Sequence, residues 1–350
     1  MLRMTRLPAL LAALLAAAAL AACGSDDSDQ GTATGAAAAT DTTASTAGPE
    51  PGALPVTIPH RYGQTTIESE PKRIVVAGLR EQDSLLALGI DPVATTEWYG
   101  EHPGAIFPWA KEALGDKPLP EVLGFTDGIQ FEKIAAQRPD LILAVYSGLT
   151  QDDYDKLSQI APTIAQPRGE VDWGSSWQEE ISTVGKAVGR PKQAAELQAK
   201  AEAQLASAAH AHPEFKRQTA IVASTYNGIY VYGPQDARSR LMGDLGFTFP
   251  AALRDIGKDD FGGQLSEERT DLMDQSVVLW FSDPKPRASL LKGVYGRLPV
   301  HTQGRDVFLP EKGTLYEATS FISVLSIPLL VDQLVPKLAA AADGDPKTAA

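Results

Sequence analysis

Arginine and aromatic residues follow several of the predicted buried strands. Arg80 comes after IVVAGL, the pair Trp98-Tyr99 comes after PVATTE, and Tyr146 comes after LILAV. In open α/β sheets, groups at the carboxyl ends of the strands line the ligand crevice. Aromatic faces and planar guanidinium groups bind large ligands by stacking and by paired hydrogen bonds, which predicts a broad binding cleft. The predicted ligand-binding residues are Arg80, Trp98, Tyr99, Tyr146, Tyr226 and Arg240.

Most of these residues also have a plain structural alternative. Arg80 lies among acidic residues and could be a surface charge. Tyr226 precedes Asn227-Gly228, a strong turn signal between two β-rich runs, and could simply flank a hairpin. Of Arg238 and Arg240, which open one predicted helix, only one is expected to face the cleft. The other tryptophans are assigned to packing or to the cleft rim: Trp109, Trp173, Trp177 and, as a core residue, Trp280.

Motifs for catalysis and for metal binding are missing from the sequence. It contains no G-x-S-x-G elbow, G-x-G-x-x-G loop, Walker loop or H-E-x-x-H pair. The five histidines are scattered, and a single cysteine excludes both a disulfide framework and a zinc–thiolate site. We therefore expect a binding protein rather than an enzyme, with no catalytic residues, no metal site of its own and no cofactor.

The N-terminal residues predict a secretory signal over residues 1–22. MLRMTR carries two arginines, and the apolar run LPALLAALLAAAALAA follows it. A transmembrane helix is the alternative, but the run is short for a membrane span and mostly alanine. Leu20-Ala21-Ala22-Cys23 resembles the lipobox of bacterial lipoproteins. The resemblance implies cleavage before Cys23, a diacylglyceryl group on its thiol, and anchoring at the extracytoplasmic face of the cell membrane.

Residues 23–54 are predicted to form a disordered tether behind the lipidated cysteine. Between 24 and 53 there is no Leu, Ile, Val, Phe, Tyr or Trp, so the segment cannot bury an apolar core. The chain has a net charge of −13 at pH 7, and the loss of two arginines with residues 1–22 makes it more acidic. Such a charge disfavours nucleic acid and anionic lipid. We expect a monomer that contacts the membrane only through its lipid.

From residue 55 onward, apolar runs suited to buried strands alternate with helical patterns, which predicts α/β architecture. Pro191 and the helix formers that follow it predict one long bridging helix over 189–212. The N-terminal α/β lobe is expected over 55–188 and the C-terminal α/β lobe over 213–345. A final helix is expected in FISVLSIPLLVDQLVPKLAAA.

Several stretches resemble the type III, or cluster A, substrate-binding lipoproteins of iron-uptake ABC transporters. They include EPKRIVVAG, FEKIAAQRPDLILAVYSGLTQDDYDKLSQIAPTIA, YVYGPQDARSRLMGDLGF and FISVLSIPLLVDQLVP. The resemblance implies two α/β lobes bridged by one long helix, with a ferric siderophore bound in the cleft between them. Haem is the alternative ligand, with Tyr146 or Tyr226 as its axial ligand. A siderophore esterase and a surface lipoprotein without a transport role are alternatives of other classes.

The same resemblance implies that the partner is a permease dimer with its ATPase, and that one glutamate on each lobe docks to it. These positions are Glu132 and Glu268, each of which lies nine residues before a predicted strand. The second motif departs from the family pattern, because Glu267 and Ser276 hold places where an apolar residue and an aspartate are usual. The register of Glu268 is therefore less well defined than that of Glu132.

Overall fold

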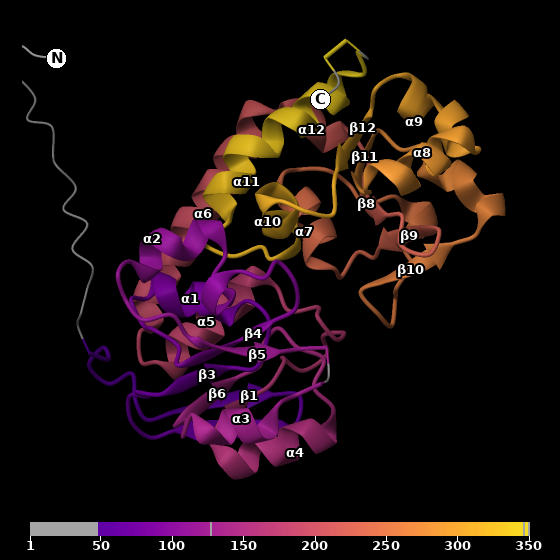
Figure 1. Ribbon diagram of the computed structural model, residues 1–350. Helices are drawn as coiled ribbons and strands as arrows, with labels where there is room; N and C mark the ends of the chain where they lie inside the picture. Colours follow the sequence, from indigo (N-terminus) through magenta and orange to yellow (C-terminus); the bar gives the residue numbers. More distant parts are fainter. Residues whose placement is uncertain (1–47, 127, 346, 349–350) are drawn as a thin grey trace, which may run out of the picture. The chain divides into compact units, whose positions relative to one another are not determined.

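The computed structural model describes residues 48–126, 128–345 and 347–348. The signal segment, Cys23 and the greater part of the predicted tether lie outside the described residues. The prediction of disorder up to residue 54 is wrong for the last residues of the tether, because the Glu50 carboxylate accepts from the backbone N–H groups of Lys192 and Gln193 at 2.9 Å. Within the described part, two α/β lobes are joined by one long helix, α6 (Pro191–Ala211), and belong to one compact unit (Figure 1). This architecture confirms the predicted fold class.

The N-terminal lobe is built on five parallel strands in the order β5-β4-β3-β6-β7. They are β3 (Ile74–Val76), β4 (Ala94–Glu97), β5 (Glu121–Gly124), β6 (Leu141–Leu143) and β7 (Thr163–Ile164), preceded by a hairpin of β1 (Val56–His60) and β2 (Gly63–Ile67). Val75 and Ile142 pack with residues of α3 and α4, whereas Ile74 and Leu141 pack with residues of α1 and α5. In Figure 1, α3 and α4 lie on one side of this sheet, and α1 and α5 lie on the other. The helices are α1 (Glu81–Ala87), α2 (Lys111–Leu114), α3 (Phe131–Ala136), α4 (Gln151–Ile160) and α5 (Trp177–Ala187).

The C-terminal lobe has a mixed sheet in the order β10-β9-β8-β11-β12, in which β9 pairs antiparallel with both of its neighbours, β8 and β10. Its strands are β8 (Ala220–Ser224), β9 (Ile229–Tyr232), β10 (Gly262–Leu265), β11 (Val277–Phe281) and β12 (Asp306–Leu309). Between β8 and β9, Asn227 and Gly228 have φ angles of 52° and 112°, which confirms the predicted hairpin turn. The helices are α7 (Ala237–Asp244), α8 (Pro284–Lys292), α9 (Pro299–Thr302), α10 (Thr314–Ser320), α11 (Ile327–Gln333) and α12 (Val335–Asp343).

Short 3-10 helices complete the described part of the chain. They are η1 (Pro103–Ala105), η2 (Pro108–Ala110), η3 (Pro213–Arg217), η4 (Ala251–Leu253), η5 (Glu267–Met273) and η6 (Tyr295–Arg297). The two lobes repeat one strand order, and β6 and β11 hold the same place, fourth, in their sheets. The nine-residue spacing after Glu132 and after Glu268 therefore leads into equivalent strands.

The bridging helix α6 packs against both lobes through small side chains. Its buried residues are Ala194, Ala201, Leu205 and Ala208. These residues belong to one apolar core that also contains Ile181 of α5, Val222 of β8 and Leu338 of α12. In Figure 1, α11 and α12 run beside α6. The two lobes are thus not independently packed bodies.

The final segment forms two helices, where the sequence predicts one. The chain is not helical between Phe321 and Ser326, and α11 and α12 are separate helices. The hydroxyl of Ser326 donates to the Phe321 carbonyl at 3.1 Å and accepts from the Ser323 amide at 2.8 Å. Such side-chain bonds to nearby backbone groups compete with helical hydrogen bonds, which explains the interruption.

Candidate functional site

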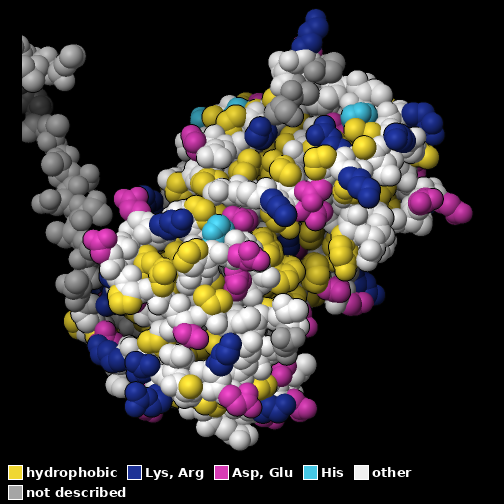
Figure 2. Space-filling view, viewed as in Figure 1, with side chains coloured by type: hydrophobic (Ala, Val, Ile, Leu, Met, Phe, Trp, Pro, Cys, Tyr) yellow, Lys and Arg dark blue, Asp and Glu magenta, His cyan; other side chains and the backbone are white. Residues whose placement is uncertain are grey.

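Aromatic side chains from both lobes meet at the carboxyl ends of the N-terminal strands. Trp98 and Tyr99 follow β4, and Tyr146 follows β6. Rings from the C-terminal lobe join them, so that a continuous group forms. We call this group the cleft aromatic cluster, and it consists of Trp98, Tyr99, Phe125, Tyr146, Trp173, Tyr316 and Phe321. Figure 2 shows hydrophobic side chains gathered where the two lobes meet.

The ring contacts of this cluster cross from one lobe to the other. The ring centroid of Tyr99 lies 5.6 Å from that of Tyr316 and 5.2 Å from that of Phe321. The centroid of Trp98 lies 6.3 Å from that of Phe321, and yet 52% of Trp98 is exposed. The adjacent pair Trp98-Tyr99 therefore presents a free aromatic face at the place where the lobes meet.

Arg80 is fully buried at the start of α1, so the alternative of a surface charge is wrong. Its Nε donates to Oε2 of Glu180, and its Nη2 donates to the Ser175 carbonyl at 2.6 Å. The guanidinium carbon lies 3.9 Å from the ring centroid of Tyr146. Nη1 has no hydrogen-bond partner among the described residues. The structure thus brings Arg80 and Tyr146 together, and their contact with a ligand stays a prediction.

Arg238 is the more deeply buried of the two arginines of α7. Its guanidinium carbon lies 3.9 Å from the ring centroid of Tyr232, and its Nε donates to Oδ1 of Asp236 at 3.0 Å. Burial by itself lowers the pKa of Arg238, but the charge of Asp236 outweighs that effect and raises the pKa. Asp236 is also the N-cap of α7. The pairing of Arg238 with Asp236 has one signal in the sequence, an aspartate just before a helix.

Arg240 lies at the rim of the cleft and joins the two lobes. Its Nη2 donates to Oε2 of Glu170 at 2.8 Å. Glu170 lines a cavity of about 610 Å³ that residues of both lobes surround. The charged residues that line this cavity are Arg61, Glu170, Asp172, Lys258, Asp259 and Asp260. Ligand contact by Arg240 stays a prediction, and the structure shows that this contact competes with an ion pair.

Two carboxyl groups beside Arg80 have strongly raised pKa values. Burial, and after it the charge of Glu180, raise the pKa of Glu81 to about 7. Burial likewise raises the pKa of Asp83 to about 7, although Trp109 Nε1 donates to its Oδ2 at 2.6 Å. The hydroxyl of Ser323 donates to the same Asp83 oxygen. Asp83 therefore links α1 to the non-helical segment before α11.

Tyr226 lies apart from the cleft aromatic cluster. It is 67% exposed at the β8–β9 turn, and its carbonyl accepts from Gln264 Nε2 at 3.0 Å. No ring contact joins Tyr226 to the cluster within the described ranges. Glu132 and Glu268 are exposed in the first turns of α3 and η5. Their exposure permits docking to a partner, which stays a prediction.

Of the other tryptophans, Trp280 lies in the core and Trp173 lies at the edge of the cleft. Trp280 is fully buried in β11, and its Nε1 donates to the Tyr295 hydroxyl at 2.7 Å, which confirms it as a core residue. Trp173 contacts Tyr146 and Phe125 at the edge of the cleft, with centroids 5.8 and 5.6 Å away. Between residues 48 and 348, the described residues contain no group of three His, Cys, Asp or Glu side chains placed to hold a metal ion.

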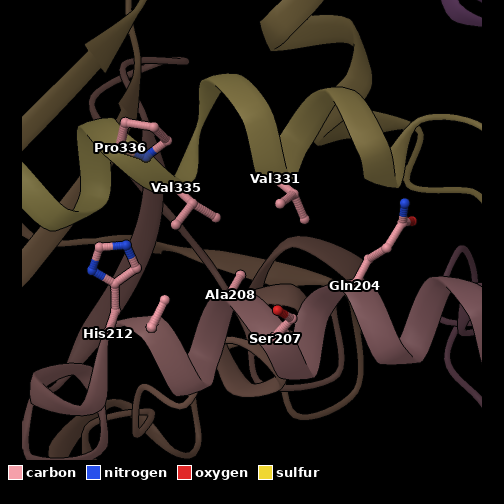
Figure 3. A pocket seen from close by; sticks show the side chains of 8 residues that line it. Gln204, Ser207, Ala208, His212, Val331, Val335 and Pro336 are labelled. Atoms are coloured by element: carbon pink, nitrogen blue, oxygen red, sulfur yellow. The ribbon is translucent and has the colours of Figure 1, made fainter. Parts of the chain in front are cut away.

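A second cavity, of about 350 Å³, lies between α6 and the pair α11 and α12 (Figure 3). Val331 and Val335 face Ala208 and Ser207 across it, and Gln204 and His212 lie toward its two ends. It lies away from the carboxyl ends of the strands and has no lysine, arginine or carboxylate in its lining. It lacks the fixed charges and aromatic faces of the cleft.

The comparison with curated relatives agrees with this geometry. The chain is 32% identical over 212 residues to the ferric enterobactin-binding periplasmic protein FepB of Escherichia coli O6:H1. That alignment covers 57% of this chain and 64% of FepB. The chain spans 61% and 64% of the lengths of the first curated relatives that it matches, which is less than two thirds of either.

Solved structures with the same fold match almost over their whole length. A periplasmic solute-binding protein of Mycobacterium smegmatis has a TM-score of 0.71 at 33% identity, covering 82% of this chain and 98% of that one. PiaA of Streptococcus pneumoniae in complex with ferrichrome has a TM-score of 0.71 at 28% identity, covering 83% of this chain and 99% of that one. A family model described as periplasmic binding protein matches residues 74–289, which confirms both the resemblance found in the sequence and a binding protein rather than an enzyme. The chain belongs to the periplasmic binding protein family.

Proposed function

We propose that this protein captures a ferric siderophore in the cleft between its lobes and delivers it to the permease dimer of an ABC transporter. The cleft aromatic cluster, with Arg80 and Arg238 beside it, is the observation that supports this most. Stacking faces and guanidinium groups suit the broad surface of a chelated ferric ion. FepB is named for ferric enterobactin, and PiaA was solved with ferrichrome, so relatives of this chain are associated with such complexes.

Haem is the alternative ligand in the same fold, and both candidate axial ligands argue against it. A tyrosine that ligates ferric haem does so through its phenolic oxygen, which must lose its proton. Burial raises the pKa of Tyr146, which disfavours that loss. The guanidinium of Arg80 also covers the Tyr146 ring. Tyr226 is exposed and lies away from the other cleft residues, so a haem bound there would gain little apolar contact.

The membrane anchor is part of the proposal. No helix within 48–126 or 128–345 is long and apolar enough to cross a membrane. Cys23 lies outside these ranges, and its acylation is proposed from the LAAC motif alone. Metabolic labelling with palmitate tests it: label in the wild type and none in Cys23→Ala supports the anchor at the extracytoplasmic face. Equal label in both proteins contradicts it.

Docking to the permease is proposed for Glu132 and Glu268. Both are exposed, and they precede the equivalent strands β6 and β11 in the two lobes. An exposed ion pair contributes only about 0–1 kcal/mol. Two such pairs on one body held at the same membrane nevertheless orient the complex and increase the encounter rate.

Quenching of tryptophan fluorescence tests the ligand class. Trp98 and Trp173 lie in the cleft aromatic cluster, so a bound iron complex is expected to quench their emission. The purified protein is titrated with ferric hydroxamate, catecholate and carboxylate siderophores and with haemin. Saturable quenching by a ferric siderophore supports the proposal. Quenching by haemin alone, or by none of the four, contradicts it.

A further inference from the structure

Among the described residues, the three arginines beside the cleft aromatic cluster are each paired with a carboxylate. The pairs are Arg80–Glu180, Arg238–Asp236 and Arg240–Glu170. The Nε of Arg238 lies 3.0 Å from Asp236 Oδ1, and the Nη2 of Arg240 lies 2.8 Å from Glu170 Oε2. The charges of the buried Arg80 and Arg238 and of the partly exposed Arg240 are therefore cancelled by neighbouring carboxylates.

Arg238 and Asp236 form the most deeply buried ion pair beside the cleft in the C-terminal lobe. Burial raises the pKa of Asp236, while the guanidinium and the backbone N–H of Arg238 act against that rise. The backbone N–H donates to Oδ1 at 2.8 Å. Arginine keeps its proton in proteins, so a protonated Asp236 would leave Arg238 as an unpaired buried charge. The charge of Arg238 is consequently cancelled inside the protein.

Further carboxyl groups lie at the strand ends and at the rim. Glu97 directly precedes Trp98, and Glu311 follows β12; neither is in an ion pair with any described residue. The pKa of Glu311 is raised by burial and then by the neighbouring charge of Asp283. In the cavity of about 610 Å³, four acidic residues line the wall with two basic ones, Arg61 and Lys258. The electrostatic balance of the cleft is neutral to acidic.

Ferric siderophores differ in charge according to their iron-binding groups. Three hydroxamates neutralise the ferric ion, so a trishydroxamate complex is uncharged at its centre. Three catecholates carry six negative charges, twice as many as three hydroxamates, and leave the complex with three negative charges. Such an anion requires uncompensated cations, because like charges placed together at an interface are strongly unfavourable. An uncharged complex requires stacking faces and donors to its oxygen atoms, and the partly exposed guanidinium of Arg240 is such a donor.

We propose that the cleft selects uncharged ferric trishydroxamate complexes over anionic ferric triscatecholate complexes, an inference that rests on the proposed siderophore-binding function. The aromatic cluster supplies the contact area, and the pairing of the arginines leaves no net positive charge beside it. The carboxyl groups at the strand ends and at the rim act against an anionic ligand. Side chains of both lobes thus discriminate between uncharged and anionic ferric complexes.

The test compares two ferric complexes on the purified protein, ferrichrome as the trishydroxamate and ferric enterobactin as the triscatecholate. Fluorescence titrations at about pH 7.5 are expected to give a Kd for ferrichrome at least about tenfold lower than for ferric enterobactin. The ferrichrome Kd is expected to change little with NaCl concentration, because no net charge is neutralised. Tighter binding of ferric enterobactin overturns the inference and leaves the proposed function intact. Binding of neither complex overturns the inference, and failure to bind a ferric carboxylate siderophore as well overturns the proposed function.

Variants that free one arginine test the cause of the selection. Asp236→Asn removes the carboxylate that pairs with Arg238. Glu170→Gln removes the one that pairs with Arg240 at the partly exposed rim, where the substitution disturbs the folded structure less. Each variant is expected to shift the ratio of the two Kd values several-fold toward ferric enterobactin. Glu196→Gln makes the same charge change on an exposed position of α6 and is the matched control. An unchanged ratio in Glu170→Gln, or an equal shift in the control, overturns the inference.

Discussion

The Trp98 indole combines a solvent-facing surface with ring contacts on its other side. It is 52% exposed, whereas Phe321, which it contacts, is 2% exposed. A large side chain that is already held by a buried neighbour loses little rotamer freedom when a ligand stacks on it. Its contact area then contributes to binding with a small entropic cost. The residue belongs to the loop after β4, where strand-end groups meet ligands.

Truncation of this side chain is expected to weaken ligand binding. Trp98→Ala removes a stacking face that contributes about 1–2 kcal/mol, which corresponds to an increase in the Kd for a ferric siderophore of about five- to thirtyfold. Isothermal titration calorimetry measures the change. Leu119→Ala removes another exposed apolar side chain, 55% exposed in the loop before β5, and is expected to leave the Kd unchanged. A wild-type Kd for Trp98→Ala contradicts the role of this residue.

Asp83 is expected to make the stability of the fold depend on pH. Burial raises its pKa from 3.8 to about 7, so the folded state binds the proton more tightly than the unfolded chain does. The free energy of unfolding therefore falls as pH rises from about 4 to about 7. Between about pH 5 and pH 8 this group alone is expected to lower it by about 2–3 kcal/mol.

Urea unfolding of Asp83→Asn checks this linkage. The variant keeps an oxygen acceptor for Trp109 and Ser323 but does not titrate. The difference in free energy of unfolding, variant minus wild type, is therefore expected to increase by about 2–3 kcal/mol as the pH rises from about 5 to about 8. Glu81, whose pKa is also about 7, titrates in both proteins and its contribution cancels in the difference. A difference that is constant over this pH range is incompatible with a raised pKa at Asp83.

The strand-end rule identified several residues of the cleft from sequence alone. Arg80, Trp98 and Tyr146 each follow a strand that has a clear apolar signal, and the structure brings them to one edge of the sheet. Tyr316 and Phe321 were not identified, because they approach from a segment more than 200 positions away and local patterns hold no information on such contacts. The pairing of each arginine with a carboxylate is likewise a property of the tertiary packing.

At the scale of elements, the close packing of α5 against α6 depends on a glycine, which has no side chain. Gly185 of α5 is buried, and a Cβ placed on it would lie 2.2 Å from the Cβ of Ala194 in α6. The two helix backbones therefore approach more closely than any side chain at position 185 permits. This contact holds α6, and with it the connection between the lobes, against the N-terminal lobe.

Gly185→Ala is expected to destabilise the protein, although Ala is the better helix former. Overpacking at the crossing costs about 1–3 kcal/mol, which outweighs a gain in helix propensity of about 1 kcal/mol. Gly243 of α7 is the matched control, because a Cβ there meets nothing within 4 Å. Gly243→Ala is expected to stabilise by up to about 1 kcal/mol. Thermal unfolding of both variants decides, and a higher midpoint for Gly185→Ala refutes the close-packing account.

Long or strongly patterned elements were predictable from sequence, and short ones were not. Pro191 and twenty helix formers identify α6, and the Asn227-Gly228 turn identifies the β8–β9 hairpin. The four-residue strands β5, β10 and β12 have weak apolar signals and depend on pairing with neighbouring strands. The final helix is interrupted by hydrogen bonds of Ser323 and Ser326, which apolar periodicity does not reveal.

At the scale of the whole described unit, two lobes of equal strand order share one apolar core. That core extends from Leu143 in the N-terminal lobe through Leu205 of α6 to Val307 in the C-terminal lobe. Separating the lobes widely would expose this core to water, which is unfavourable in proportion to the apolar area. The shared core therefore keeps the two lobes, with the cleft between them and any docking groups on them, in a nearly fixed arrangement.

Charge reversal at the two docking positions is expected to stop transport without affecting binding. The double variant Glu132→Arg, Glu268→Arg places repulsive charges on both lobes, so cellular uptake of a radiolabelled ferric siderophore is expected to fall to the level of cells that lack the protein. The purified variant is expected to bind the siderophore with the wild-type Kd. Glu112→Arg with Glu196→Arg, at two other exposed positions, is the control and is expected to transport normally. Normal uptake by the first variant, at equal expression, rules out the docking role.

The central claim is that a ferric siderophore binds between the two lobes against the cleft aromatic cluster. Anomalous diffraction at the iron absorption edge, from crystals of the protein grown with ferrichrome, tests it most directly. The account predicts one strong iron peak per molecule, in the cleft, flanked by Trp98 and Tyr99 on one side and by the α7 region around Arg238 on the other. An iron peak in the cavity between α6 and α12 would contradict it, and so would the absence of a peak with each of ferrichrome, a ferric catecholate and a ferric carboxylate siderophore at saturating concentration.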